Sequence, residues 1–224
     1  MNTISEWSLI ERGEFEEACR VADQLYQQSG SEPILANKAI ALLNLKKFDQ
    51  VVQLGKLLID ITNGRREYDF IIAGIANWLM DEKQEAIQYW QEAQSKPRYT
   101  DAAGGVEVPL LLYYAGVRLD NTALKADATR KLKKRIRNKQ AMNWPGPLAA
   151  YVVGELDEHE LLLRVSTMPI LQDRELCQAY FWIGVQTLDA DPSHSKESWN
   201  KAIDCTPACF LEFEYYLAKD QLGK

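Results

Sequence analysis

One spacing recurs along this chain and constrains its fold more than any other feature. Phe15 and Phe48 are 33 residues apart, and Ala18 precedes Val51 by the same step. Val51 is followed by Ala86 after 35 residues. A period near 34 residues is typical of stacked helix pairs, each too small to bury its apolar face alone. The spacing therefore predicts an all-α array in which each pair packs on its neighbours.

The stretch 70–97 shows the predicted unit most clearly. Its first segment carries small residues at helical spacing, Gly74 among them, and its second segment carries Trp90. A short polar turn separates the segments, and Pro97 ends the second because proline lacks the N–H that a helix interior needs. We expect two short helices that touch at Gly74, with Trp90 filling the space beside the contact.

The small-residue position continues past a longer connection. Gly74 and Gly116 are 42 residues apart, and Ala150 and Gly184 then follow at steps of 34. About six helix pairs are therefore expected, in one domain over residues 1–224 that ends in a helix covering the open apolar face. The predicted parts are three regular repeats (1–97), an inserted connection (98–109), three more divergent repeats (110–207) and a capping helix (208–224).

This pattern resembles the tetratricopeptide repeat family, whose units keep small residues at three fixed places with larger apolar residues between them. The third unit fits the family best, through Gly74, Ala86, Trp90, Ala93 and Pro97. The resemblance implies a right-handed α-solenoid whose first helices line a concave groove that binds a protein partner.

The distal third of the chain is also similar to bacterial tetratricopeptide proteins of the NlpI lipoprotein type. The similarity runs from Trp144-Pro145 through YVVGELDEHELL to FLEFEYYLAKDQL. Membrane attachment in that type needs a signal peptide and a lipidated cysteine, and this sequence shows neither. We therefore expect a bacterial adaptor without a membrane anchor.

Charge and cysteine content limit which compartment and which class of partner the sequence favours. The net charge of −6 and the pI near 5.1 argue against nucleic acid or an anionic membrane as the main partner. Four scattered cysteines without a zinc spacing favour a reducing, cytoplasmic location. Cys205 and Cys209 leave two interpretations open, a redox pair or two packed and inert thiols.

The sequence does not point to an enzyme, a cofactor or a metal site. His159 and His194 lie 35 residues apart without metal-ligand spacing, and each is interpreted as an exposed polar residue. Neither accompanies a serine or cysteine motif, and no phosphate-cradling glycine pattern occurs. Asp189 and Asp191 are interpreted as a plain acidic turn rather than a calcium loop.

Two candidate binding surfaces follow from the sequence. The first is the predicted concave groove, where apolar anchors would hold a partner, although each is equally consistent with inter-repeat core. By repeat position these anchors are Trp7, Ile40, Ile71, Trp78, Tyr113, Val117 and Phe181.

The second candidate surface is the basic segment 125–139. Removing its eight cations and one acid from the chain totals of 26 and 32 leaves 18 basic and 31 acidic residues, a balance of −13. The segment is interpreted either as a solvated helix face, with Leu124, Ala128, Leu132 and Ile136 turned inward, or as a site for RNA or an acidic partner. Its cations are Lys125, Arg130, Lys131, Lys133, Lys134, Arg135, Arg137 and Lys139.

Three functions remain open from the sequence. The leading prediction is a non-enzymatic adaptor that binds a protein through the groove. An immunity protein that neutralises a cognate bacterial toxin is the first alternative, and RNA or acidic-partner binding through 125–139 is the second. The sequence does not indicate which protein is bound.

Overall fold

A computed structural model describes residues 5–95 and 105–224 of the chain. In these ranges the chain forms thirteen α-helices and two short 3-10 helices, with no strand, which confirms the all-α class. The chain divides into two compact units, Met1–Tyr99 and Thr100–Lys224. Among the described helices, none is both long enough and apolar enough to cross a lipid bilayer.

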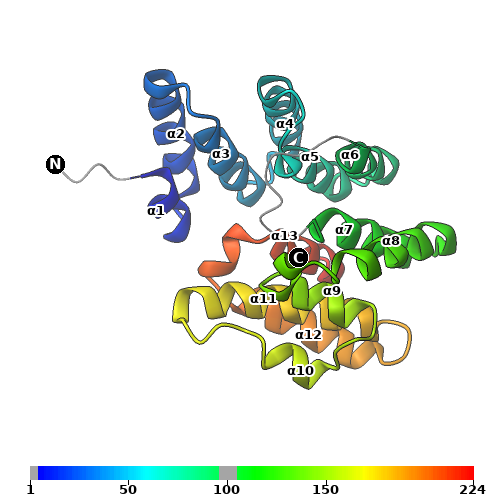
Figure 1. Ribbon diagram of the computed structural model, residues 1–224. Coiled ribbons are helices and arrows are strands. Elements are labelled where there is room, and N and C mark those ends of the chain that lie inside the picture. The colour runs from blue at the N-terminus through cyan, green and yellow to red at the C-terminus, as the bar shows by residue number, and fades with distance from the viewer. Residues whose placement is uncertain (1–4, 96–104) are drawn as a thin grey trace. The chain divides into compact units, whose positions relative to one another are not determined.

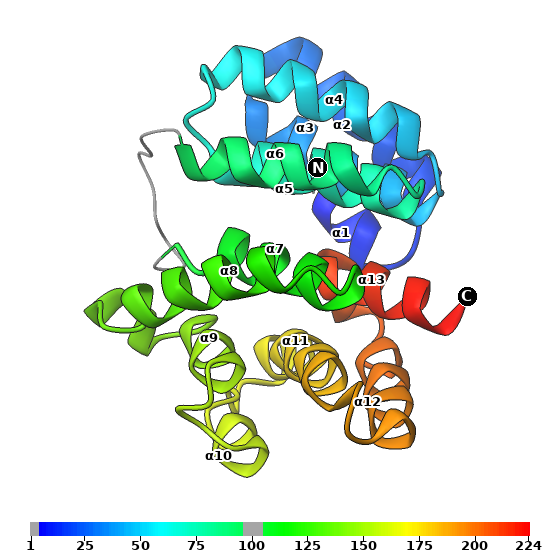
Figure 2. The same ribbon diagram turned by 90° about the vertical axis from the view of Figure 1, so that its right-hand side faces the viewer.

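Unit 1 consists of three helix pairs that follow one another in chain order (Figure 1). Each helix packs on the next, and the first helices of neighbouring pairs also touch, α1 on α3 and α3 on α5. Figure 2 shows the long α4 and α6 of this unit from the side. The helices are α1 (Glu6–Glu11), α2 (Phe15–Ser29), α3 (Glu32–Asn44), α4 (Phe48–Thr62), α5 (Glu67–Leu79) and α6 (Lys83–Ser95).

Unit 2 is built around its longest helix, α11, on which α9, α10, α12, α13 and η2 all pack. The α7–α8 pair joins this group because α8 packs on α9. The elements are α7 (Glu107–Arg118), α8 (Thr122–Arg135), η1 (Lys139–Met142), α9 (Gly146–Val152), α10 (Glu158–Leu162), α11 (Pro169–Thr187), α12 (Pro192–Asp204), η2 (Ala208–Leu211) and α13 (Phe213–Leu222).

One predicted boundary is wrong. The connection predicted over 98–109 ends earlier, because α7 already begins at Glu107. Pro109 is accommodated there since the first turn of a helix has no internal partner for its N–H groups. Residues 98–104 of that connection and Pro97 lie outside the described residues.

Five hairpin turns close in the same way. In each, a residue of left-handed backbone conformation is followed by one whose N–H donates to a carbonyl five residues back. This bond occupies a carbonyl that the end of the first helix would leave unpaired. The left-handed residues are Gly13, Lys46, Asp81, Asp120 and Gly154. Three of these bonds measure 2.9 Å from N to O: Glu14 to Leu9, Lys47 to Leu42 and Glu82 to Asn77. The other two measure 2.8 Å: Asn121 to Gly116 and Glu155 to Ala150.

Gly74 and Trp90 meet where α5 packs on α6. Trp90 is fully buried, and its Nε1 donates to the carbonyl of Ile71 at 3.4 Å. A Cβ added at Gly74 would lie 2.2 Å from that nitrogen, so only glycine leaves room for the indole. The predicted contact at Gly74, with Trp90 beside it, is confirmed.

The α11–α12 pair repeats this joint in unit 2. Trp199 Nε1 donates to the carbonyl of Phe181 at 3.3 Å. Phe181 precedes Gly184 by three residues, just as Ile71 precedes Gly74 by three. A Cβ at Gly184 would lie 2.4 Å from the same nitrogen. The two units therefore hold one helix pair each by the same glycine–tryptophan contact.

Candidate functional site

The seven predicted groove residues are mostly core residues. Ile40, Ile71, Trp78, Tyr113 and Phe181 are buried, whereas Trp7 and Val117 are half-buried. A buried side chain cannot contact a partner unless the surrounding helices move, so burial agrees with the core interpretation that the sequence had left open. Their role in binding stays a prediction.

Local contacts explain why the aromatic members of this set are held inside. Trp78 stacks on Trp90 with ring centroids 5.7 Å apart, and Lys83 Nζ lies 4.3 Å from the Trp78 ring centroid. The Tyr113 hydroxyl donates to Gln186 Oε1 at 2.6 Å. These rings are therefore already engaged within their own units.

The basic segment forms α8 because its N-terminus is capped and its apolar residues share one side. Asn121 is the N-cap, and its side chain accepts the Leu124 N–H at 3.0 Å. Ala128 and Leu132 are buried, while Leu124 and Ile136 are half-buried. The predicted inward stripe is confirmed, and the cations therefore lie on the other sides of the helix.

The α8 helix sits close against α7. A Cβ added at Gly116 would lie 2.7 Å from the backbone nitrogen of Lys125, so the glycine allows the two backbones to approach. Lys125 in turn places its Nζ 5.5 Å from the ring centroid of Tyr113 on α7. This packing holds the first turn of α8 in place relative to the rest of unit 2.

Asp127 is the single acid of the segment, and it pairs with two of the cations. Its carboxylate accepts from Arg130 and, at 2.7 Å, from Lys131. Hydrogen bonds from Lys131 and Arg130 lower the pKa of Asp127, so it stays ionised. In the part of the chain that the structure describes, Lys133, Lys134 and Arg137 have no such carboxylate partner.

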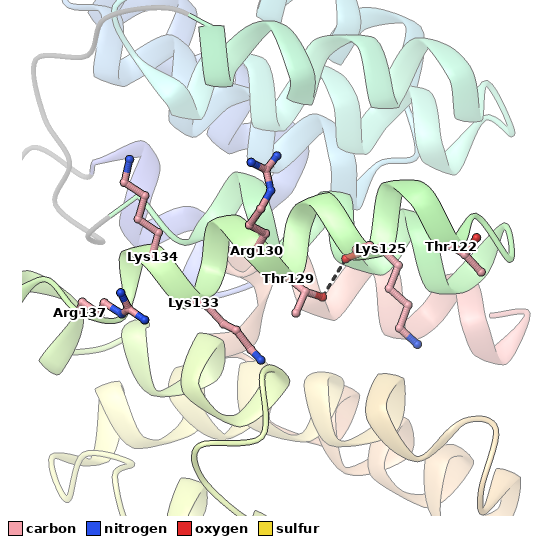
Figure 3. A pocket seen from close by; sticks show the side chains of 8 residues that line it. Thr122, Lys125, Thr129, Arg130, Lys133, Lys134 and Arg137 are labelled. Carbon is pink, nitrogen blue, oxygen red and sulfur yellow. Dashed lines mark hydrogen bonds between the residues drawn. The ribbon is translucent and has the colours of Figure 1, made fainter.

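One side of α8 is hollowed, and we call it the basic face (Figure 3). Its lining combines short side chains at 122, 126 and 129 with long cationic ones. Arg130 and Lys134 point to one side of the helix, and Lys125 and Lys133 to the other. The described residues of this face are Thr122, Lys125, Ala126, Thr129, Arg130, Lys133, Lys134 and Arg137.

Not every predicted cation belongs to the basic face. Lys131 and Arg135 are half-buried beside it, and Lys139 begins the separate helix η1. The structure thus brings five of the eight predicted cations together around the hollow.

A smaller hollow of about 440 Å³ in unit 1 was missed by the sequence analysis. It lies between α3 and α4, and Leu57 on its rim is 44% exposed, with Ile61 one turn further at 37%. The sequence of α4 contained a signal for this hollow, because α4 carries apolar residues in addition to the inward-facing Val51 and Leu58. Its lining residues are Lys38, Leu42, Gln50, Gln53, Leu54 and Leu57.

His194 and the acidic turn before it make contacts within unit 2. His194 Nε2 lies 2.9 Å from Glu158 Oε2, a contact between α12 and α10, whereas His159 is exposed. Asp191 caps α12 by accepting the N–H groups of Ser193 and His194 at 3.1 and 3.0 Å. Within 5–95 and 105–224, no three His, Cys, Asp or Glu side chains are placed to share a metal ion.

The cysteines are packed thiols. Burial raises the pKa of Cys19 and raises that of Cys205 to about 12, so both stay protonated near neutral pH and are weak nucleophiles. Cys209 is buried and lies within hydrogen-bonding reach of Cys177, which is buried as well. The neighbour of Cys209 on α11 was not foreseen from the sequence, because it lies 32 residues away.

A buried acidic network links α11 to α13. Arg174 donates to Glu212, and burial raises the pKa of Glu212 to about 7 although Arg174 acts in the opposite direction. Glu214 accepts from Trp182 Nε1 at 3.2 Å and from Gln178 Nε2 at 3.3 Å, and burial raises its pKa as well. These bonds attach the C-terminal helix to α11.

A scan against protein-family models and a search of curated proteins each found no match to this chain. The candidate site therefore rests on the geometry described above.

Proposed function

We propose that this chain is a non-enzymatic, tetratricopeptide-like binding protein whose partner is another protein. The observation that carries the proposal is the shared closure of the five hairpin turns. Inside the helix pairs, the donor residues of that closure follow one another at steps of 33, 35, 39 and 34 residues. The same bond also occurs once between pairs, after α4, from Gly64 N to Ile59 O at 2.8 Å. A backbone element repeated at this period is the mark of helix-pair arrays, which present extended surfaces to partners.

The contacts between first helices support the same proposal. In unit 1, α3 touches both α1 and α5, so consecutive pairs stack through their first helices. Stacking of this kind buries one side of each pair and leaves the other side for binding.

Affinity capture from the native cell tests the proposal. The full chain is used as bait, captured material is treated with nuclease, and proteins are identified by mass spectrometry. We expect one protein in roughly equal molar amount with the bait, retained after nuclease treatment. Material lost on nuclease treatment, or no protein in comparable amount, contradicts the proposal.

The purified partner then separates the two protein-binding functions. If the partner is an enzyme or toxin that loses activity when one equivalent of this chain is added, the chain is an inhibitor of the immunity type. If the partner keeps its activity and the complex recruits a further protein, the chain is an adaptor.

A further inference from the structure

The geometry points to the basic face of α8 as a binding surface for an acidic, extended segment of a partner protein. This inference rests on the proposed function, because it names the kind of protein segment that the chain binds.

Only part of the charge of the face is compensated by acids in the described ranges 5–95 and 105–224. Arg130 pairs with Asp127, but Lys133, Lys134 and Arg137 meet no carboxylate among the residues that the structure describes. On α12, by contrast, Lys201 pairs with Glu197 one turn away at 2.7 Å. Like charges on neighbouring turns destabilise a helix, so a ligand with carboxylates would relieve a repulsion that the free chain retains.

The shape of the face suits an extended chain. Thr122, Ala126 and Thr129 are short and fall at helical steps of four and three, so they form a short floor along the first half of α8. Lys125 borders this floor on one side and Arg130 and Lys134 on the other, and Lys133 continues its line at the next helical step. The Thr129 hydroxyl is already used, since it donates to the Lys125 carbonyl at 2.8 Å. A backbone laid along this floor would have cations on both sides (Figure 3).

The length of the face sets the size of the segment. The helical part of the face spans α8 (Thr122–Arg135) and advances roughly 20 Å along the axis at 1.5 Å per residue, and Arg137 lies in the turn just beyond it. An extended chain covers that distance with about six residues, whose side chains alternate between the two sides. A segment with acidic residues at most of these positions would meet cations on both sides of the face.

The same features favour a protein segment over nucleic acid. No aromatic side chain belongs to the described lining of the face, so it offers no ring on which a base could stack. Outside 125–139 the chain has a balance of −13, and a polyanion longer than the face would meet that acidic remainder.

Fluorescence anisotropy with defined probes tests the inference. The probes are a labelled deca-glutamate peptide and a labelled deca-uridine RNA, each titrated with the full chain at low and at physiological salt. We expect the peptide to bind more tightly than the RNA and to weaken as salt increases. In the triple variant Lys133→Glu, Lys134→Glu, Arg137→Glu, peptide affinity is expected to fall by at least about tenfold.

A matched variant separates a local site from overall charge. The variant Lys47→Glu, Lys56→Glu, Lys196→Glu reverses three exposed lysines on elements other than α8 and changes the net charge by the same amount. Its peptide affinity is expected to stay within about threefold of the parent. All changes are at exposed positions, and unchanged circular dichroism confirms that each variant is folded.

Three outcomes overturn the inference. Equal loss in both triple variants means that net charge alone attracts the peptide. Tighter binding of the RNA, lost on reversal at α8, makes nucleic acid the ligand. If neither probe binds while affinity capture still recovers a protein partner, the basic face is a solvated surface and the proposed protein-binding function stands without it.

Discussion

At the scale of single residues, the glycine–tryptophan joint decides how closely two helices approach. The indole of Trp90 occupies the volume that a side chain at Gly74 would need, and its N–H pairs with a carbonyl of the opposite helix. Both the packing and the hydrogen bond are therefore lost together when the ring is removed.

A double-mutant cycle tests this joint. Trp90→Ala is expected to lower the free energy of unfolding by about 3–5 kcal/mol, because it empties a fully buried site. Gly74→Ala should also destabilise the parent, but in the Trp90→Ala background the new methyl group has room and should stabilise by up to about 1 kcal/mol through helix propensity. Urea denaturation measures all four proteins.

The same double-mutant cycle at Gly184 and Trp199 tests the equivalent contact in unit 2. A Gly→Ala change that destabilises equally with and without the indole would show that another contact limits the approach of the helices.

A second residue-scale prediction concerns Glu212. Its pKa is about 7 in the folded chain against an ordinary value of 4.5, so the folded state holds a proton that the unfolded state releases between these values. Stability should therefore fall as pH rises from about 4.5 to about 7, by up to about 3 kcal/mol for this group. Denaturation across this pH range measures the slope.

The variant Glu212→Gln should flatten that part of the curve, because an amide does not titrate. Glu155→Gln, at an exposed position, should leave the slope as it is. An identical slope in the parent and in Glu212→Gln would mean that other groups cause the pH dependence; burial raises the pKa of Asp69 and Glu214 in the same direction.

At the scale of elements, helix ends and turns specify where each hairpin begins and ends. The side chain of Asn121 caps α8, and the backbone N–H of the same residue closes the preceding turn onto Gly116. The short α10 begins with a capping box in which Asp157 and Glu160 each accept the backbone N–H of the other.

Asn121→Ala tests the importance of the α8 cap. Loss of the side-chain acceptor should cost about 1 kcal/mol of stability, whereas Asn121→Asp should keep the cap and restore it. Thermal unfolding followed by circular dichroism gives the comparison. If Ala and Asp variants are equally destabilised, the backbone closure rather than the side chain holds this end of the helix.

At the scale of the whole molecule, the number of unfolding transitions is the open question. The sequence predicted one cooperative array, and the described structure has two compact units. We expect a far-ultraviolet circular dichroism spectrum that is almost purely helical, lost on urea addition in two steps. Trp90→Ala should move the step of unit 1 and Trp199→Ala that of unit 2.

A single transition shifted equally by both variants would instead support one cooperative domain. A substantial strand signal in the native spectrum would contradict the fold itself.

The sequence by itself determined the local parts of this protein. Its 34-residue period, its small residues and its apolar spacing predicted the helix pairs, the contact at Gly74 and the inward stripe of α8, because helix geometry depends on neighbours within a few turns. It also located the cations that line the basic face.

Only the tertiary structure decided which surfaces are available. It buried most of the predicted groove residues, selected five of eight cations for the hollow and paired Cys209 with Cys177. It also brought Glu212 beside Arg174, 38 residues away, where burial changes its pKa. Burial and long-range pairing depend on how whole helices pack, which spacing along one helix does not contain.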